Sequence, residues 1–444
     1  MKNTSTLDRR LFIKGAGAAT FMAGAASLPA ATASAKGMGH MSMSMAYDLN
    51  EEFNRIGSND FKWDMIRKGA RPYDVKWPMG VADMDFRTLP QITSALQSRL
   101  NHHNWGYEAP PADYKANIVA WNKSRYDQTV DPSTIENCIG VLDGVSSVLR
   151  TVCEPGDKVI LHTPNYSSFF GVIPGALCEL AESDLINDNG VYDFDYDDTE
   201  RLLRDGAKAI ILCNPQNPTG NCWTAEQLRK LGDLANQYNA LMIADEIHCD
   251  FVNKNATYIP YAELGEAYAM NSVTLKSTSK SFNLAAHRTG YMFTDNKELM
   301  DRIKKVGNHN RFLLNIMGLI ASNAAYKHGS TYMDDMQSYM DGNAKFLESY
   351  LKENIPSIKY SVHEGTYLAW LDCKDLAKKL GDPEGEDRVG DMLKKFFIEK
   401  AAVNINPGEN YGRTGVGYMR MNLGTTHKKL HDALNSMKAA IDAI

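Results

Sequence analysis

The sequence lacks the features of several classes of protein. Its net charge is −6 and it has no dense cluster of lysine and arginine, so we do not expect a nucleic acid as a partner. Its seven cysteines include no Cys-x-x-Cys pair and no spacing typical of a metal site. An odd number of cysteines in a chain of 444 residues also argues against a disulfide framework. We therefore expect mostly buried thiols and no metal.

The N-terminal region lacks an apolar run long enough to span a membrane. Its apolar stretch, residues 15–28, is rich in alanine and glycine and is too short and too weakly apolar for a spanning helix. The sequence Asp-Arg-Arg-Leu-Phe-Ile-Lys (8–14) precedes this stretch, and Ala-Ser-Ala (33–35) follows it. A basic start, a short apolar region and a small-residue cleavage site predict a signal peptide over residues 1–35. The alternatives are a membrane anchor and a chance pair of arginines.

The paired arginines of this segment resemble the twin-arginine type of signal. That resemblance implies passage through the twin-arginine export machinery and a periplasmic or otherwise exported protein, with no membrane segment in the mature form. The mature chain would begin with a methionine-rich segment, residues 36–47. Its thioethers and one histidine are suitable ligands for Cu(I), but the interpretation we adopt is a disordered terminus.

The remaining sequence has the composition of a soluble globular protein, with 43% hydrophobic and 23% charged residues, and it shows no internal repeats. Three continuous apolar runs predict buried strands, at residues 158–161, 209–213 and 241–244. Helical patterns lie between and beyond them, at 89–102, 298–306, 312–327, 334–354 and 389–400, and Thr224 is placed to cap another helix.

This alternation of strands and helices favours βαβ units and a mainly parallel sheet covered on both faces. We predict an α/β fold with a three-layer αβα large domain over residues 95–333. A smaller α+β domain follows over residues 334–444, with a strand at 367–371. The irregular, aromatic segment 48–94 is expected to pack with the small domain.

Polar side chains follow the predicted strands at their carboxyl ends. Asn217 follows the strand at 209–213, Asp245 follows the strand at 241–244, and Lys280 follows a further apolar run. Ligands of parallel sheets bind at this edge, so we expect the three side chains to converge. Lys280 also lies among serines, with Arg288 eight residues downstream. A nucleophilic lysine beside hydroxyls and a cation suits a cofactor that carries a phosphate.

Three motifs in this order carry a resemblance to a known family. They are Asn-Pro-Gln-Asn-Pro-Thr-Gly (214–220), Asp-Glu-Ile-His (245–248) and Ser-Thr-Ser-Lys-Ser-Phe-Asn (277–283). From about residue 48 to the C-terminus the chain resembles pyridoxal-phosphate enzymes of the aspartate-aminotransferase fold, in the class I/II superfamily. Within that superfamily, Val-Ala-Asp-Met-Asp-Phe (81–86) and the Asp-Glu-Ile-His motif are similar to the cystathionine β-lyase branch, the MalY/PatB type.

The resemblance implies roles for individual residues around pyridoxal 5′-phosphate. Lys280 would bind the cofactor as a Schiff base and would also move the Cα proton of the substrate. Asp245 would pair with the pyridinium nitrogen, and Asn217 would hydrogen-bond the phenolate oxygen and contact the substrate. His248 would lie near that oxygen or behind Asp245, and Tyr166 would stack on the ring.

The resemblance also implies groups for the phosphate and for the substrate. Backbone or side-chain groups of five residues would hold the phosphate: Gly144, Val145, Ser277, Ser279 and Arg288. Tyr107 would reach the phosphate of the neighbouring subunit, which implies a homodimer with shared active sites. Arg420 would bind the carboxylate of the amino-acid substrate. Taken singly, Asp245 could cap a helix, Tyr166 and His248 could be core residues, and Arg420 could form a surface ion pair.

The implied reaction is β-elimination from a sulfur amino acid such as cystathionine or a cysteine S-conjugate, which releases a thiol, pyruvate and ammonia. Transamination to a 2-oxo acid shares the removal of the Cα proton and is the first alternative. Racemisation, and a binding role without catalysis, are also compatible with the sequence. The chain departs from the branch where Gly80 replaces a usual tryptophan, Asp143 a proline and Gln216 a histidine, and also at His287 and Arg288. Because of these departures, the resemblance does not identify the substrate.

Overall fold

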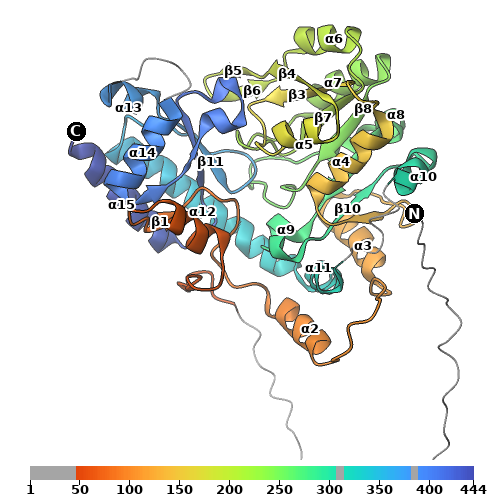
Figure 1. The fold of residues 1–444 in the computed structure, drawn as a ribbon, viewed down its shortest axis with the longest axis horizontal. Helices are drawn as coiled ribbons and strands as arrows, with labels where there is room; N and C mark the ends of the chain where they lie inside the picture. Colours follow the sequence, from red (N-terminus) through yellow and green to blue (C-terminus); the bar gives the residue numbers. More distant parts are fainter. Residues whose placement is uncertain (1–46, 307–314, 382–388) are drawn as a thin grey trace, which may run out of the picture. The chain divides into compact units, whose positions relative to one another are not determined.

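The computed structural model describes residues 47–306, 315–381 and 389–444 (Figure 1). The predicted signal peptide and all but the last residue of the methionine-rich segment lie outside the described residues. No helix within the described ranges is long and apolar enough to cross a membrane.

A seven-stranded sheet forms the centre of the first part of the chain. Its strand order is β2-β10-β9-β8-β7-β3-β4. All pairs from β9 to β4 are parallel, whereas β10 is antiparallel to both of its neighbours. The strands are β2 (Glu136–Cys138), β3 (Lys158–Thr163), β4 (Glu179–Asp184), β7 (Ala209–Cys213), β8 (Leu241–Asp245), β9 (Ser272–Lys276) and β10 (Gly290–Phe293).

Helices cover both faces of this sheet because the strand side chains alternate between two apolar clusters. In β7, Ile210 belongs to one cluster and Ile211 to the other. The first cluster contains side chains of α6 (Tyr196–Arg204) and α7 (Ala225–Gln237). The second contains side chains of α4 (Val141–Val152), α5 (Phe169–Gly175) and α10 (Lys297–Val306). The predicted three-layer α/β architecture is confirmed (Figure 1).

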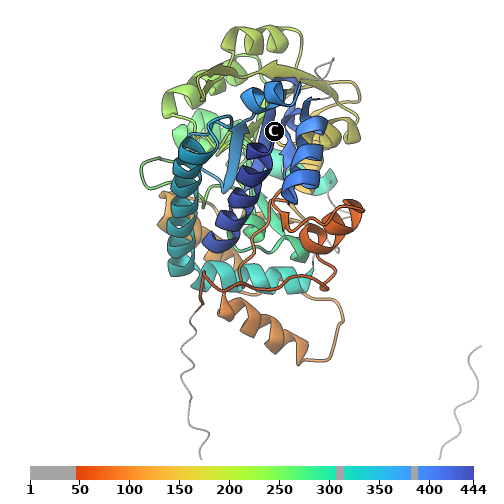
Figure 2. The same cartoon turned by 90° about the vertical axis from the view of Figure 1, so that its left-hand side faces the viewer.

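A smaller antiparallel sheet, β11-β14-β13, lies in the C-terminal part. Its strands are β11 (Leu368–Asp372), β13 (Asn406–Pro407) and β14 (Tyr418–Asn422). An apolar core joins it to nearby helices, and Figure 2 shows two of them, α12 and α15, side by side. The helices of this part are α11 (Ile316–His328), α12 (Ser330–Asn354), α13 (Lys374–Lys379), α14 (Val389–Ala401) and α15 (His427–Asp442).

The N-terminal segment joins the C-terminal part through β1 (Trp77–Pro78), which pairs in parallel with β12 (Val403–Asn404). It continues into α2 (Pro90–Leu100) and α3 (Tyr114–Tyr126). Short elements complete the fold: η1 (Phe61–Met65), α1 (Ile66–Gly69), the hairpin β5 (Ile186–Asp188) and β6 (Val191–Asp193), η2 (Tyr261–Leu264), α8 (Glu266–Met270), α9 (Thr278–Ser281), η3 (Ala285–His287), η6 (Gly408–Tyr411) and η7 (Arg413–Gly415).

Most predicted elements occur within a few residues of their expected ends. The helix expected from residue 334 begins earlier, at Ser330, because Met333 belongs to the same buried face as Met336 and Met340. Part of the helix expected at 312–327 falls outside the described residues, and α11 begins at Ile316. Two predicted domain limits, 94/95 and 333/334, fall inside α2 and α12. The described cysteines are free thiols and all except Cys153 are buried, as expected.

Candidate active site

A cavity of about 210 Å³ opens at the carboxyl ends of the central strands. Cys213 and Asp245, the last residues of β7 and β8, line it, and Lys280 lies in α9 just after β9. The cavity brings together seven of the residues predicted from the sequence: Tyr166, Asn217, Asp245, His248, Ser279, Lys280 and Arg288. The predicted convergence at the edge of the sheet is therefore present.

Lys280 lies at this edge because a short capped helix begins directly after β9. The Ser277 hydroxyl accepts a hydrogen bond from the backbone N–H of Ser279, at 3.0 Å, and so caps α9. The Nζ of Lys280 donates to the carbonyl oxygen of Ala82 at 2.8 Å. Burial lowers the pKa of Lys280 to about 8, and the positive charge of Arg420 acts in the same direction. The neutral amine, which a nucleophile or base requires, is therefore far more abundant near pH 7 than for an ordinary lysine.

Asp245 is buried at the carboxyl end of β8. Burial raises the pKa of its carboxyl group to about 7, while the backbone N–H of Ile247, 3.1 Å from Oδ1, and the charge of Lys280 oppose that rise. A carboxylate in this position becomes more stable when a cationic group lies against it. Asp245 is therefore suited to hold a protonated ring nitrogen.

Arg420 is a buried cation with polar partners but no carboxylate partner in the described parts of the chain. Its Nη1 donates to Oδ1 of Asn217 at 3.1 Å, and its Nη2 donates to the carbonyl oxygen of Gly80 at 2.8 Å. Its guanidinium lies over the ring of Tyr411, 4.9 Å from the centroid, and its Nε is buried without a partner. Only 3% of Arg420 is exposed, so it does not form a surface ion pair. A buried guanidinium of this kind suits a substrate carboxylate.

His248 and Tyr166 line the cavity with ring groups. Burial lowers the pKa of His248 well below its usual value, and the charges of Lys280 and Arg420 add to this effect, so the imidazole is neutral. Its Nδ1 is buried and has no partner among the described residues. Tyr166 is partly buried and packs edge-on against Phe169, with ring centroids 5.7 Å apart. Neither residue is simply part of an apolar core.

The structure corrects the prediction for Gly144 and Val145. The helix α4 already begins at Val141, and the N–H of Gly144 donates to the carbonyl of Gly140 at 3.0 Å within it. A Cβ on Gly144 would lie 2.5 Å from the side chain of Leu275, and Val145 is fully buried in the core. The cavity is lined instead by residues 139–143, whose N–H groups at the helix start are the ones suited to an anion.

The other predicted phosphate residues divide into two sets. Ser279 and Arg288 line the cavity, and Arg288 adopts a left-handed backbone conformation with φ of 49°. Such a conformation is unusual for a residue with a side chain and often marks a functional site. Ser277 lies behind them, because its hydroxyl donates to the carbonyl of Thr289 at 2.6 Å and contacts the Ser279 hydroxyl at 2.7 Å. Its assignment as a direct phosphate ligand stays a prediction, and in this structure its hydroxyl supports Ser279.

Tyr107 lies outside the cavity, between α2 and α3, and is fully exposed. Its predicted role requires a neighbouring subunit and stays a prediction.

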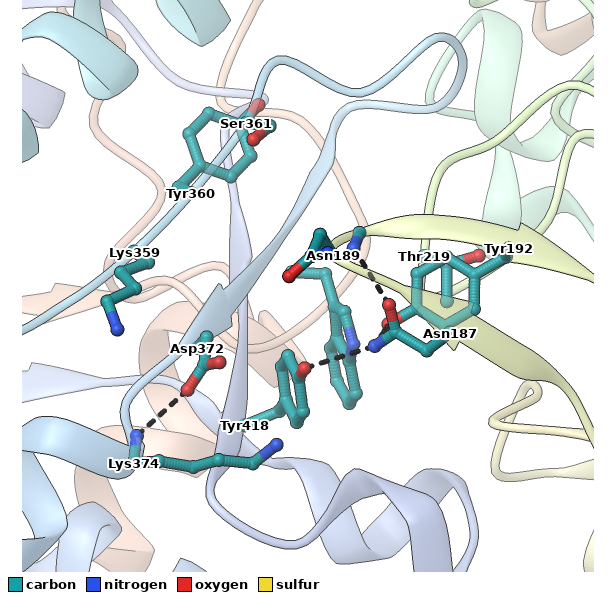
Figure 3. A pocket seen from close by; sticks show the side chains of 12 residues that line it. Asn187, Asn189, Tyr192, Thr219, Lys359, Tyr360, Ser361, Asp372, Lys374 and Tyr418 are labelled. Atoms are coloured by element: carbon teal, nitrogen blue, oxygen red, sulfur yellow. Dashed lines mark hydrogen bonds between the residues drawn. The ribbon is translucent and has the colours of Figure 1, made fainter.

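A second, larger cleft of about 480 Å³ lies between the β5–β6 hairpin and the ends of β11 and β14 (Figure 3). Within it, the amide nitrogen of Asn187 donates to the Tyr418 hydroxyl at 3.2 Å, and the backbone N–H of Lys374 donates to Asp372 at 3.0 Å. None of the predicted site residues lines this cleft, so the smaller cavity is the candidate active site. No group of three or more His, Cys, Asp or Glu side chains in the described ranges is arranged to hold a metal ion.

Comparison with known proteins agrees with this geometry. Residues 75–437 match the family described as aminotransferase class I and II. The chain belongs to this family. It is 32% identical to cystathionine β-lyase PatB of Bacillus subtilis over 404 residues, which cover 89% of the chain and all of that protein. It is 30% identical to protein MalY of Escherichia coli over 402 residues, which cover 90% of the chain and all of that protein.

A solved structure, the PLP-bound C-S lyase from Staphylococcus hominis, matches the fold with a TM-score of 0.81 and 29% identity. The match covers 90% of the chain and 99% of that structure. The fold and the branch expected from the sequence are thereby confirmed.

The sequence did not reveal the backbone segment 80–84, which accepts hydrogen bonds from both Lys280 and Arg420. Nor did it reveal Tyr367, whose hydroxyl donates to the carbonyl of Ala82 at 3.0 Å. The Val-Ala-Asp-Met-Asp-Phe motif carries the resemblance to the branch, and the backbone carbonyl of its Ala82 accepts the hydrogen bond from Lys280.

Proposed function

We propose that the chain is a pyridoxal-phosphate-dependent carbon–sulfur β-lyase that converts cystathionine or cysteine S-conjugates to a thiol, pyruvate and ammonia. The observation that carries the proposal is one cavity lined by a lysine with a pKa near 8 and a buried carboxyl group, with the buried Arg420 hydrogen-bonded to Asn217 of the same lining. Relatives that share this fold over almost their whole length are named cystathionine β-lyase and C-S lyase.

The residues of the cavity fit pyridoxal 5′-phosphate. The start of α4, Ser279 and Arg288 supply donors and positive charge for a phosphate at one end. Asp245 supplies a carboxylate whose buried charge a protonated pyridine nitrogen would compensate. The unpartnered Nδ1 of His248 and the ring of Tyr166 line the space between. When bound, the cofactor supplies an electron sink that makes the Cα proton of an amino acid acidic.

The chain's own residues then divide the chemical work. Arg420 holds the carboxylate of the substrate, and Asn217 keeps the guanidinium in place. The neutral amine of Lys280 removes the Cα proton, and the carbonyl of Ala82 is in place to accept a hydrogen bond from the resulting ammonium. Lys280 can return this proton to the departing sulfur as a general acid, so that the thiol leaves neutral.

The product pattern of the loaded enzyme tests this proposal. With cystathionine and no added 2-oxo acid, we expect pyruvate and ammonia in equal amounts together with a thiol. The absence of pyruvate, with the cofactor bound, would contradict the lyase assignment.

Transamination is the second candidate, because the family to which the chain belongs is described as aminotransferase class I and II. Both reactions need the same removal of the Cα proton by Lys280. Transfer of the amino group of an amino acid to 2-oxoglutarate, without release of ammonia, would favour this alternative.

We also propose a homodimer in which Tyr107 of one subunit reaches the phosphate of the other. The complete exposure of Tyr107 and the 54% exposure of Trp105 support the proposal, since exposed aromatic side chains are frequent at interfaces. Light scattering gives the mass in solution. Mixing inactive Tyr107→Ala with inactive Lys280→Ala should restore activity through mixed dimers, and no restoration would contradict shared sites.

Export through the twin-arginine pathway is proposed on residues 8–14 and 33–35 alone. Replacement of Arg9 and Arg10 by lysine should retain the uncleaved chain in the cytoplasm. N-terminal sequencing of the exported wild-type chain should begin at Lys36.

A further inference from the structure

Five consecutive backbone carbonyls, those of residues 80–84, all accept hydrogen bonds from side chains. The carbonyl of Gly80 accepts from Arg420, and that of Ala82 accepts from Lys280. The carbonyl of Val81 accepts from Asn422, and that of Asp83 accepts from Asn422 and Lys62. The carbonyl of Met84 accepts from Arg55 and Asn283. These backbone groups, which belong to no helix or strand, are thus held by side chains from three other parts of the chain. The segment has no freedom to shift unless several of these bonds break.

Asn422 is placed to control the centre of this segment. It lies in β14, two residues after Arg420, so both side chains point to the same face of the strand. Met419 and Met421 point to the opposite face and enter the apolar core. Asn422 is only 1% exposed, and the contacts of its amide with segment 80–84 are therefore made without competition from water.

The hydrogen bonds of Asn422 bracket Ala82. Its Nδ2 donates to the carbonyls of Val81 and Asp83, both at 2.6 Å, and its Oδ1 accepts from the N–H of Gly424 at 2.7 Å. The residue between these two carbonyls is the one that accepts from Lys280. One side chain therefore fixes both peptide groups that adjoin the acceptor of the lysine.

We propose that Asn422 is a positioning residue that fixes the Ala82 carbonyl as the hydrogen-bond acceptor of Lys280, and with it the place from which Lys280 moves a proton. The inference rests on the proposed function only in so far as Lys280 removes the Cα proton of a bound amino acid. It does not depend on which bond breaks afterwards. Asn422 touches neither Lys280 nor Arg420 through any described hydrogen bond, so it acts through the backbone.

Loss of the Ala82 carbonyl as an acceptor should change the pKa of Lys280 in a predictable direction. The charged and titratable groups that face Lys280 are Arg420 from β14, Asp83 from the segment and Asp245 from β8. His248 also faces it and is neutral. A carbonyl that accepts from the ammonium favours the protonated lysine, so displacement of Ala82 should lower the pKa of Lys280. The acid limb of the pH profile should then move to lower pH.

The test follows exchange of the Cα hydrogen of L-alanine in D₂O, catalysed by the cofactor-loaded protein. L-Alanine carries no leaving group, so exchange reports on Lys280 whether or not the protein cleaves a carbon–sulfur bond. We expect Asn422→Ala to retain the visible absorbance of the bound cofactor and to slow exchange by about ten- to a hundredfold. The acid limb of its pH profile should lie below that of the wild type.

Asn343→Ala is the matched control. Asn343 is also 1% exposed, and its amide also donates to two backbone carbonyls, those of Leu423 and Thr425, at 3.0 and 2.9 Å. It holds a neighbouring loop rather than segment 80–84, so its loss should lower stability without slowing exchange or moving the acid limb.

Exchange at the wild-type rate and pH profile in Asn422→Ala would overturn the inference, and so would an equal loss in Asn343→Ala. If Asn422→Ala does not fold, Asn422→Asp decides, because it keeps the size and the acceptor for the Gly424 N–H while it removes both donors. Normal exchange in Asn422→Asp would contradict the role of Asn422. A wild-type protein that exchanges L-alanine but releases no pyruvate from cystathionine contradicts the lyase proposal alone.

Discussion

Arg420 donates a hydrogen bond from Nη1 to Oδ1 of Asn217 at 3.1 Å, although 203 residues separate the two in the chain. This contact joins β14 of the small antiparallel sheet to the loop that follows β7 of the central sheet. Arg420, which is suited to the substrate carboxylate, and Asn217, which is predicted to hold the cofactor, therefore position each other. The binding of substrate and of cofactor should be coupled through this pair.

Replacement of Arg420 by lysine should weaken substrate binding. A lysine cannot keep the bonds to Asn217 and Gly80 and also present a planar pair of donors to a carboxylate. The KM for cystathionine should rise by about 10- to 100-fold, as expected for the loss of a charge-assisted hydrogen bond of roughly 1.5–3 kcal/mol. Arg413→Lys is the control, because Arg413 is exposed and pairs with Asp184 at the surface. An unchanged KM in Arg420→Lys would remove Arg420 from the substrate site.

The rate at which Lys280 captures pyridoxal phosphate should depend on pH in a predictable direction. Burial lowers the pKa of Lys280 to about 8, and only the neutral amine reacts. In the cofactor-free protein the rate should rise as pH increases from 6 and should level off above pH about 8. Stopped-flow absorbance measures this rate. A rise that continues to the ordinary pKa of lysine, near 10.5, would show that the amine is not perturbed.

Asp245 should make the stability of the cofactor-free protein depend on pH between 4 and 7. Burial raises its pKa to about 7, whereas the unfolded chain has an ordinary carboxyl pKa near 3.8. Between these values the folded state binds more protons, so the free energy of unfolding falls as pH rises, by up to about 1.4 kcal/mol per pH unit. Above pH 7 this effect levels off.

In the variant Asp245→Asn, the free energy of unfolding should not fall in this way as pH rises. Urea unfolding of both cofactor-free proteins at pH 5 and pH 7 provides the comparison, and the variant should gain stability relative to the wild type as pH increases. If the free energies of unfolding of the two proteins differ by the same amount at pH 5 and at pH 7, Asp245 is ionised at both pH values. The same variant should lose activity, because its side chain cannot hold a protonated ring nitrogen.

A buried cluster of charges supports the segment 80–84 from the N-terminal side. Asp85 accepts from Lys62 and Arg55, both at 3.0 Å, and from Nε1 of Trp63 at 2.8 Å. The side chains of Lys62 and Asp85 are only 2% and 3% exposed. Asp85→Ala would remove the closer carboxylate of the buried Lys62 ammonium and leave only Asp83, at 3.6 Å, so it should lower the free energy of unfolding by about 3 kcal/mol.

The control for this variant is Asp74→Ala. Asp74 pairs with Arg67 at 3.1 Å, but its side chain is 69% exposed, so the loss should stay below about 1 kcal/mol. Urea titration of both variants at pH 7 gives the two values. Equal losses would show that the buried cluster contributes no more than a surface ion pair.

The sequence was sufficient to predict the central sheet and most of the cavity. The strands β7 and β8 are continuous apolar runs because both of their faces are covered by helices. Polar residues that follow such strands must collect at one edge, which placed Asn217, Asp245 and Lys280 together. Thr224 forms the expected cap, as part of a capping box with Gln227.

Other parts of the site depend on contacts that no local pattern encodes. Asn422 and the segment 80–84 are about 340 residues apart, and an asparagine in a strand gives no indication of its partners. The resemblance implied backbone groups of Gly144 and Val145 for the phosphate, yet the sequence did not show which N–H groups at the start of α4 face the cavity. Only the packing of Gly144 against Leu275 reveals that the helix turns this residue inward.

The departure at Gly80 has a structural reason that the sequence alone did not show. A Cβ at this position would lie 2.5 Å from Oδ1 of Asn406, whose amide donates to the Gly80 carbonyl at 2.9 Å. The space next to the substrate arginine is therefore filled by an amide from β13. A larger residue at position 80 would have to displace Asn406 and would disturb the bond to Arg420.

The most direct test of the central claim is the release of pyruvate from cystathionine by the cofactor-loaded wild type and by Lys280→Ala, measured without any added 2-oxo acid. We predict continuous release by the wild type and none above background by the variant, although Lys280→Ala should remain folded and still bind the cofactor non-covalently. Release by the variant at a rate near that of the wild type would contradict the assignment of Lys280 as the catalytic residue.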